Sequence, residues 1–394
     1  MKYLKLLIRN ILAGLGYSIS NSTHKAKVLC NVFNTTYNRT ALVSYIQNVF
    51  EDARNQADER HTNRLTTAII AETLRDLGYN VDVINYSDDI EDRFNTYDIV
   101  IGLGKSLDSV LSKRSSSKKP KVIWFGTGCN PLFSNTATIK RVDDFYKKHG
   151  KIVLTSSRYI KEDWVLQHEF ADWIILHGST FSRSTYRKEN ISSIHAPVFI
   201  KHNITRTDNE WATAKQNFIW FGSNGAIHKG LDLVIDAFTE RKDCTLHICG
   251  DIENEVDFFK LYSPLIKSSS NIKYHGFVNV ESDSFKKILQ SCAFVIYPSA
   301  SEGNSPAVLT CMANGGLVPV VSKNADIDLN GYGILIDELT IESVSSAVQK
   351  SQDLSVSELK AQSKLVLKET TRFNSFNYFK EDFKLKLQEA IKTI

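Results

Sequence analysis

The chain has 394 residues, of which 48 are Lys or Arg and 44 are Asp or Glu, so its formal net charge at neutral pH is +4. This mild charge gives no reason to expect a nucleic-acid partner. A hydrophobic content of 42% indicates a globular protein, and the length suits two domains better than one core. The six cysteines include no Cys-x-x-Cys pair, which indicates neither a zinc site nor a disulfide framework and fits a reducing cytoplasm.

Residues 1–25 are predicted to form an amphipathic helix. Its apolar and basic residues fall on opposite faces: Leu4, Leu7, Ile8, Ile11 and Leu15 on one, and Lys2, Lys5 and Arg9 on the other. No stretch of the sequence is long and apolar enough to span a bilayer, and Arg9-Asn10 interrupts the apolar region that a signal peptide needs. The pattern favours a cytoplasmic protein held on the anionic inner face of a membrane through residues 1–20. The alternative is a helix packed on its own domain.

Residues 26–205 alternate short apolar strands with helices. A helix is expected from about Thr62, and Gly78 ends it in the left-handed conformation that follows many helices. The expected strands are Lys27–Phe33, Val81–Tyr86, Asp98–Leu103, Lys121–Thr127, Lys151–Ser156 and Asp172–Gly178. This alternation predicts a parallel sheet covered by helices, which forms an N-terminal domain.

A second series of the same kind occupies residues 206–370, after the polar segment Lys201–Trp211. Helices are expected at Leu231–Phe238 and Phe285–Cys292. The expected strands are Asn217–Gly222, Thr245–Gly250, Ile272–Phe277, Ala293–Pro298, Leu317–Ser322 and Gly333–Asp337. The fold class is therefore α/β, with two doubly wound, Rossmann-like domains facing a cleft. Residues 371–394 are expected to form a C-terminal helix that packs back on the N-terminal domain.

The first unusual loop of the second domain is Trp220–Gly230, WFGSNGAIHKG. A tight turn follows the strand, built from Gly222, Ser223, Asn224 and Gly225. Lys229 stands just before the next helix, where its point charge would suit a diphosphate. The alternative is an ordinary turn with a solvated lysine. In a second loop, His275–Ser282, the backbone around Phe277 is a candidate wall for a nucleotide base.

The third loop lies in Tyr297–Gly316, YPSASEGNSPAVLTCMANGG. Small residues free the amides of Gly303, Asn304 and Ser305 at a helix N-terminus, and such amides suit a phosphate. Glu302 would repel a phosphate. Glu302 therefore either caps the helix, or the ligand carries hydroxyls beside its phosphates.

Together the three loops resemble the donor domain of the GT-B glycosyltransferases, particularly the large retaining family 4, glycosyl transferases group 1. The matching residues are Lys229-Gly230 and Glu302, and the motifs lie within Phe218–Ser322 of a resemblance that covers the chain after residue 26. The resemblance implies a GT-B fold and transfer of a sugar, with retention, from a nucleotide-sugar donor to an acceptor hydroxyl, without a metal or other cofactor. It implies that Lys229 and the loop amides hold the diphosphate, and that Glu302 bonds hydroxyls of the donor sugar and takes part in catalysis. The acceptor is expected to be lipid-linked or a saccharide, in cell-surface polysaccharide or glycolipid synthesis.

The sequence departs from the family pattern at two positions. Ser223 stands where the family has an arginine, and Thr310 stands where it has a second glutamate that grips the ribose. Each change removes a charge-assisted bond worth roughly 1.5–3 kcal/mol. A non-catalytic nucleotide-sugar-binding protein therefore stays open as an alternative.

The acceptor side carries weaker candidates. They are His61 and Asn63 at the start of the helix near Thr62, the loop Gly126–Asn130, and His177 at a strand end. His61 is the candidate catalytic residue, although a histidine at a helix start is more often a capping or surface residue. Asp326–Asp328 mimics a metal-binding Asp-x-Asp and is predicted to be mere surface charge.

Two other enzyme classes are possible on such a fold. A nucleotide-dependent dehydrogenase needs a Gly-x-Gly-x-x-Gly loop after its first strand, and Val28–Thr40 contains no glycine. A GT-B epimerase or phosphorylase is the other, but the lysine signature of a pyridoxal phosphate site is not visible.

Overall fold

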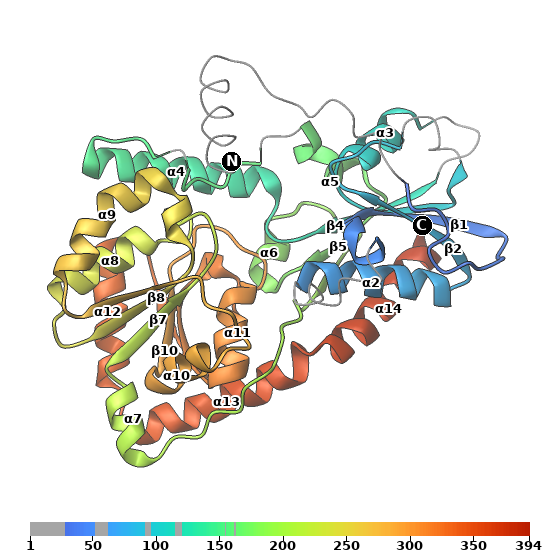
Figure 1. Ribbon diagram of the computed structural model, residues 1–394. Coiled ribbons are helices and arrows are strands. Elements are labelled where there is room, and N and C mark those ends of the chain that lie inside the picture. The colour runs from blue at the N-terminus through green and yellow to red at the C-terminus, as the bar shows by residue number, and fades with distance from the viewer. Residues whose placement is uncertain (1–27, 52–61, 91–95, 115–119, 154, 161–162) are drawn as a thin grey trace.

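The computed structural model describes residues 28–51, 62–90, 96–114, 120–153, 155–160 and 163–394. They form two six-stranded parallel sheets, each flanked by helices (Figure 1). The first sheet has the order β2-β1-β3-β4-β5-β6, from β1 Arg39–Tyr45, β2 Tyr79–Asn85, β3 Ile99–Gly102, β4 Lys121–Gly126, β5 Trp173–His177 and β6 Ile191–Ile194. The second has the order β12-β11-β10-β7-β8-β9, from β7 Asn217–Phe221, β8 Thr245–Cys249, β9 Ile272–Gly276, β10 Phe294–Tyr297, β11 Val318–Ser322 and β12 Ile334–Ile336. The predicted α/β class with two doubly wound domains is confirmed.

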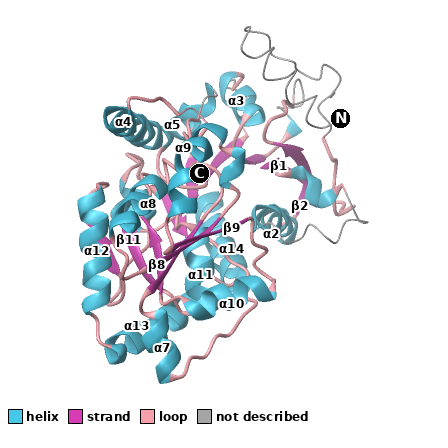
Figure 2. Cartoon of the chain, turned by 60° about the vertical axis from the view of Figure 1, so that its left-hand side comes forward, coloured by secondary structure: helices cyan, strands magenta, loops and turns pink. Residues whose placement is uncertain are grey.

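Helices cover both faces of each sheet (Figures 1 and 2). The α-helices are α2 Thr62–Asp76, α3 Lys105–Ser112, α4 Pro131–His149, α5 Gln167–Phe170, α6 Thr180–Ser184, α7 Asp208–Ala214, α8 Leu231–Glu240, α9 Val256–Ser268, α10 Asp283–Ser291, α11 Pro306–Gly315, α12 Ile341–Asp353, α13 Val356–Phe373 and α14 Phe376–Thr393. The short 3₁₀ helices are η1 Gln47–Phe50, η4 Asp163–Leu166, η5 Ile252–Asn254 and η6 Lys323–Ala325. Gly78 follows α2 at φ +85°, the left-handed conformation predicted for it.

The prediction of a first strand at Lys27–Phe33 is wrong. The first strand is β1, whose residues Ala41 to Tyr45 are all buried because the strand lies inside the sheet between β2 and β3. Around Leu29 the chain makes only an isolated antiparallel bridge to Val83. Residues 46–62, which follow β1, also contain no glycine, so the glycine loop of a nucleotide-dependent dehydrogenase is absent there as well.

The predicted strand Lys151–Ser156 is also absent. Its described residues run as a loop, and Val153 packs into the core of the second domain. The sixth strand of the first sheet is instead β6, a four-residue segment with two serines that the apolar pattern did not reveal. All six strands predicted for the second domain are confirmed.

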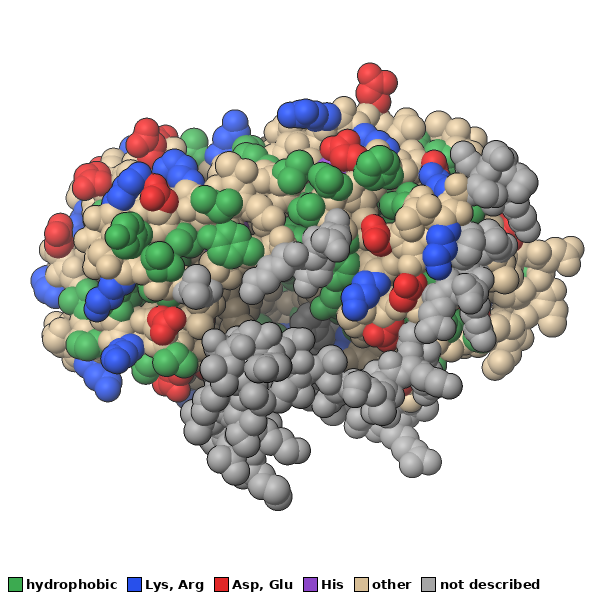
Figure 3. Space-filling view, turned by 90° about the horizontal axis from the view of Figure 1, so that it is seen from above, with side chains coloured by type: hydrophobic (Ala, Val, Ile, Leu, Met, Phe, Trp, Pro, Cys, Tyr) green, Lys and Arg blue, Asp and Glu red, His purple; other side chains and the backbone are tan. Residues whose placement is uncertain are grey.

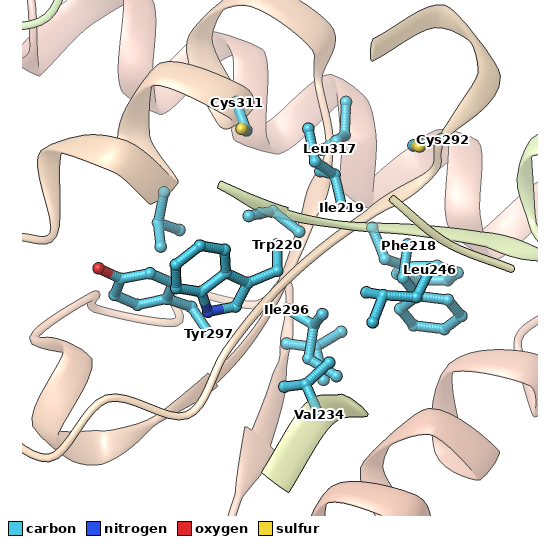
Figure 4. Packing of buried hydrophobic residues seen from close by; sticks show 14 of the residues in the cluster. Phe218, Ile219, Trp220, Val234, Leu246, Cys292, Ile296, Tyr297, Cys311 and Leu317 are labelled. Carbon is cyan, nitrogen blue, oxygen red and sulfur yellow. The ribbon is translucent and has the colours of Figure 1, made fainter. Parts of the chain in front are cut away.

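The core of the second domain fixes the strands whose loops carry the candidate site (Figure 4). Phe218 of β7 lies opposite Phe294 of β10, and their rings stack with centroids 4.8 Å apart. Near the ends of the same strands, Trp220 and Tyr297 stack at 6.0 Å and are fully buried. Interiors packed in this way hold neighbouring strands rigidly, so the loops that leave β7 and β10 start from fixed points.

Two helices cross between the domains. Helix α14 brings Phe379, Phe383 and Leu387 into the core of the first sheet, although it follows the second domain in sequence. Helix α4 follows β4 of the first sheet but lies over α8 and α9 of the second domain (Figures 1 and 2). On α4, Arg141 forms a buried ion pair of 2.6 Å with Asp232 of α8. The two domains are therefore joined by packed helices as well as by the connecting chain.

Candidate active site

The glycine loop after β7 and the glutamate loop after β10 lie side by side. Strands β7 and β10 are parallel neighbours, so their carboxyl ends meet at one edge of the sheet. The backbone amide of Ala300 donates to the carbonyl of His228 over 2.8 Å. A Cβ atom on Gly230, at φ +69°, would lie 2.3 Å from the carbonyl oxygen of Pro298. The two loops therefore approach too closely for any residue but glycine at this position.

Lys229 reaches back across its own loop and is almost fully buried. Its Nζ donates to the hydroxyl of Ser223 over 2.9 Å and to the Ser223 carbonyl over 3.1 Å. Burial, followed by the charge of Arg158, lowers the pKa of Lys229 to about 8, while Glu302 and Glu255 oppose that change. Ser223, at the position of the family arginine, thus holds the lysine in place.

Glu302 faces away from the helix that follows it. Its carboxylate lies 3.3 Å from Arg158 Nη1 and accepts from the hydroxyls of Ser299 at 3.2 Å and Tyr297 at 3.4 Å. Burial raises its pKa, but the positive charge of Arg158, then that of Lys229, outweighs this effect and leaves the pKa below its usual value. Ser305 is the N-cap position of α11, and the contacts of Glu302 give no support to the alternative that it caps this helix.

Backbone amides of both donor loops are bonded to buried carboxylates inside the protein. The amides of Gly225 and Ala226 donate to the buried carboxylate of Glu255 over 2.6 and 3.0 Å. The amide of Asn304 donates to Asp326 over 3.0 Å, and Ser305 is buried, with its hydroxyl on the carbonyl of Ala325. The expectation of a free amide is therefore wrong for Asn304, and the amide of Gly225 is not free either.

The prediction that Asp326 and its neighbours are surface charge is wrong for Asp326, which is 1% exposed. Its carboxylate accepts from the amides of Ser179, Ser182 and Asn304 over 2.9, 2.9 and 3.0 Å, and from the Ser179 hydroxyl over 2.7 Å. Ser179 and Ser182 belong to the start of α6 in the first domain, where unpaired amides favour an anion. Asp326 thus ties the two domains together beneath the glutamate loop.

The predicted acceptor loop Gly126–Asn130 lies against the glutamate loop. A Cβ atom on Gly303 would lie 2.4 Å from the Cα of Gly128 and 2.6 Å from the carbonyl oxygen of His177. The amide of Cys129 donates to the Glu302 carbonyl over 3.3 Å. The two glycines allow the backbones of the domains to touch at this point.

A cavity of about 350 Å³ opens between the domains beside these loops. Its walls combine aromatic and apolar side chains with a few polar groups. They include Trp124, Thr127, Gly128, Tyr159 and Trp164 from the first domain and His228, Ser301 and Glu302 from the second, with Arg158 between them. Apolar walls with a few polar groups are typical of a small-molecule site.

His228 is a fixed, neutral part of this wall. Its Nε2 donates to the Ser301 carbonyl over 2.7 Å, so its Nδ1 accepts from the Thr138 hydroxyl over 2.8 Å. Burial lowers its pKa to about 4. This histidine is uncharged at neutral pH, and it connects α4 to the glycine loop.

Arg158 is a charged cavity residue that the sequence motifs do not reveal. It lies in the loop before η4, far from both donor motifs in sequence, yet its guanidinium contacts Glu302. A Cβ atom on Gly225 would lie 2.6 Å from its Cγ and Cδ, so the side chain runs along the glycine loop. No local pattern distinguishes this arginine, because only the tertiary fold brings it to the site.

The remaining predicted residues are dispersed. His61 and the N-terminal residues 1–25 lie outside the described residues. Asn63 lies on α2, and Phe277 is 77% exposed just after β9. His177 does not face the cavity, since it is buried between Phe125 and Phe379, and burial lowers its pKa to about 4.

Gly222, Asn224 and Thr310 belong to the loops or the helix where the sequence placed them. The turn is tight at Gly222, where a Cβ atom would lie 2.7 Å from the Trp220 ring, and Asn224 is exposed. Thr310 lies on α11 and donates its hydroxyl to the Pro306 carbonyl over 2.7 Å. It therefore supplies no carboxylate at the position of the second family glutamate.

Two doubly wound domains, with a lysine and a carboxylate at one sheet edge and a cavity between the domains, are the arrangement of the GT-B fold. Residues 215–351, which hold both loops, match the model of the family described as Glycosyl transferases group 1. The second domain is thus that of a glycosyltransferase, as the sequence predicted.

Solved structures share this fold over nearly the whole chain. Sucrose-phosphate synthase from Thermosynechococcus elongatus has a TM-score of 0.59 and 11% identity, covering 90% of this chain and 100% of that one. A glycosyltransferase from Rickettsia africae has a TM-score of 0.56 and 12% identity, covering 91% and 100%. Anabaena HepE, determined in complex with UDP and glucose, has a TM-score of 0.53 and 12% identity, covering 90% and 100%. At this identity the likeness establishes the fold. A search of curated protein sequences finds no match.

Proposed function

We propose that the protein transfers a hexose from a nucleoside diphosphate sugar to a hydroxyl of an acceptor held in the interdomain cavity. One observation carries the proposal: Glu302 lines a cavity that the opposite domain completes, and Lys229 lies behind it in the adjacent loop after β7. The two loops are joined by the hydrogen bond from the Ala300 amide to the His228 carbonyl, and the charge of each group shifts the pKa of the other. A ligand that carries both phosphates and hydroxyls accounts for a cation and a carboxylate in one site.

Lys229 is assigned to the leaving diphosphate. Negative charge grows on this group as the sugar–phosphate bond breaks, and a preorganised cation lowers the barrier because it needs no reorganisation at that moment. Ser223 fixes the Nζ, and burial strengthens its field. Glu302 is assigned to the donor sugar, whose hydroxyls can donate to its ionised carboxylate. We further propose retention of configuration, as the resemblance to family 4 implies, and a reaction that requires no metal.

The acceptor is proposed to be an uncharged sugar or a lipid-linked saccharide. Among the described residues that line the cavity, the charged side chains are Arg158 and Glu302, which pair with each other. Trp124, Tyr159 and Trp164 offer aromatic surface to the apolar face of a sugar ring. This lining favours a neutral acceptor over one that carries a phosphate.

A place at the inner face of a membrane, in polysaccharide or glycolipid synthesis, is part of the proposal and rests on residues 1–20. Among the described residues, no helix is long and apolar enough to cross a membrane. On the face seen in Figure 3, basic and acidic side chains are interspersed, so the described surface there shows no large basic patch. The membrane contact is therefore assigned to the N-terminal segment and not to this face of the domains.

A donor screen tests the proposed function. The full-length protein is incubated with UDP-, GDP-, ADP- and dTDP-sugars, with and without simple saccharide acceptors, and release of the nucleoside diphosphate is measured in buffer with and without EDTA. One nucleotide class should be bound and slowly hydrolysed, with faster release when a suitable acceptor is present. Absence of binding to every nucleotide sugar would contradict the proposal, and binding without turnover under any acceptor would favour the non-catalytic alternative.

A further inference from the structure

We propose that Arg158 is the second diphosphate-binding cation of this enzyme, delivered to the donor site by the first domain, and that it rests on Glu302 until the donor arrives. The inference rests on the proposed function. It assigns to Arg158 a role that neither donor motif contains, and it assigns to the Arg158–Glu302 ion pair a role in donor binding.

The donor loops by themselves offer little positive charge. The amides of Gly225 and Ala226 are bonded to Glu255, and the amide of Asn304 is bonded to Asp326. Each of these amides already donates a hydrogen bond to a buried carboxylate, and it would have to lose that hydrogen bond to bind a phosphate. Lys229 is left as the cation of the glycine loop, and Ser223 beside it is uncharged.

Arg158 lies where a second cation is needed. Its aliphatic stem runs along Gly225, and its guanidinium reaches Glu302 at 3.3 Å. The position is also electrically coupled to Lys229, since the charge of Arg158 contributes to lowering the pKa of that lysine. A diphosphate bound beside Lys229 would therefore lie close to Arg158, whose planar donors suit phosphate oxygens.

The segment that carries Arg158 is held at both ends. Before it, Val153 packs into the core of the second domain. After it, the backbone of Ile160 exchanges two hydrogen bonds with the Asn135 side chain of α4, of 2.9 and 3.0 Å. The side chain itself is 47% exposed, so a ligand in the cavity can reach it. Val153 and Ile160 thus anchor the loop on either side of Arg158, while the guanidinium can change partners.

If Arg158 leaves Glu302 for the diphosphate, binding of the diphosphate would be coupled to binding of the donor sugar. When the diphosphate takes Arg158, the carboxylate of Glu302 loses its cation and becomes available to the hydroxyls of the donor sugar. A nucleoside diphosphate sugar satisfies both groups at once, whereas a free diphosphate satisfies Arg158 and leaves Glu302 without its partner. The ion pair therefore favours the complete donor over the nucleotide product.

The test compares nucleoside diphosphate with nucleoside monophosphate, using the base that the wild-type enzyme binds. Isothermal titration is carried out on the wild type, Arg158→Ala, Arg158→Lys and the control Arg187→Ala, which removes an exposed arginine of the same domain. Arg158→Ala should weaken diphosphate binding roughly 10-fold to 100-fold, as expected for a lost charge-assisted bond, and should weaken monophosphate binding much less. Arg158→Lys should recover part of the loss, and Arg187→Ala should match the wild type. Melting temperatures establish that all variants are folded.

Two results would overturn the inference. One is a diphosphate affinity that is unchanged in Arg158→Ala, which would leave the proposed function intact. The other is an equal loss for diphosphate and monophosphate, which would make Arg158 a structural residue of the loop. If the wild type binds no nucleoside diphosphate at all, the proposed function fails, and the role of Arg158 fails with it.

Discussion

Replacing Glu302 by glutamine should separate nucleotide binding from sugar transfer. The substitution keeps the shape of the side chain and removes its negative charge. Glu302 contacts Arg158 at 3.3 Å, and the arginine is 47% exposed, so the pair is worth only about 0.2–1 kcal/mol. Binding of free nucleoside diphosphate no longer has to break this pair, and its affinity should therefore rise by roughly 1.4-fold to 5-fold.

Transfer should change in the opposite direction. An ionised carboxylate that accepts from sugar hydroxyls contributes about 1.5–3 kcal/mol, and its loss in the transition state corresponds to a fall in kcat of roughly 10-fold to 150-fold. Titration calorimetry with the diphosphate and initial rates of nucleotide release measure the two effects on the same preparation. Ser299→Ala is the matched control, because it removes a hydroxyl that Glu302 accepts from and keeps the charge.

The directions in which diphosphate affinity and transfer rate change distinguish a sugar-binding role of Glu302 from a structural one. Tighter diphosphate binding with slower transfer is the expected pair of results. If Glu302→Gln weakens the diphosphate, lowers the melting temperature and leaves kcat for the bound donor unchanged, the glutamate stabilises the loop and the assignment to the sugar is refuted.

Three further predictions concern other parts of the molecule. Because the pKa of Lys229 is lowered to about 8, the lysine is charged below pH 8, and the affinity for diphosphate should fall as the pH rises above that value. Lys229→Arg should flatten this decline. A wild-type affinity that stays level from pH 7 to 9.5 would contradict the role of the lysine. Asp326→Ala should lower the free energy of unfolding by at least about 3 kcal/mol, because the buried amides of Ser179, Ser182 and Asn304 would lose their hydrogen-bond acceptor. An unchanged denaturation midpoint would show that these bonds contribute little. Deleting residues 1–20 should abolish flotation with anionic vesicles at low salt while diphosphate binding persists; full-length protein that ignores such vesicles would remove the membrane assignment.

The repeating fold and the two donor loops could be predicted because both follow from local pattern. Strands buried in a parallel sheet read as short apolar runs, and the residues after their carboxyl ends meet at one edge. That rule alone brings Lys229 and Glu302 together. It failed where the pattern was ambiguous: Lys27–Phe33 is as apolar as a strand, but it pairs only at one bridge, while β6 carries two serines and was overlooked.

The rest of the site depends on tertiary packing that the sequence does not display. Glu255 and Asp326 occupy backbone amides from distant positions, and in sequence each is one acidic residue among many. Arg158 is brought to Glu302 by a loop whose ends are fixed by Val153 and Asn135. Sequence motifs could identify the two donor loops, but not which of their amides are free or where the second cation lies.

A crystal structure of the protein with the nucleoside diphosphate sugar that it binds would show directly which groups hold the donor. We expect the diphosphate to lie between Lys229 and Arg158, with Arg158 released from Glu302 and a hydroxyl of the donor sugar within hydrogen-bonding distance of the Glu302 carboxylate. A nucleotide sugar bound away from the loops after β7 and β10, or bound there with the Arg158–Glu302 pair intact and the sugar out of reach of Glu302, would contradict this expectation.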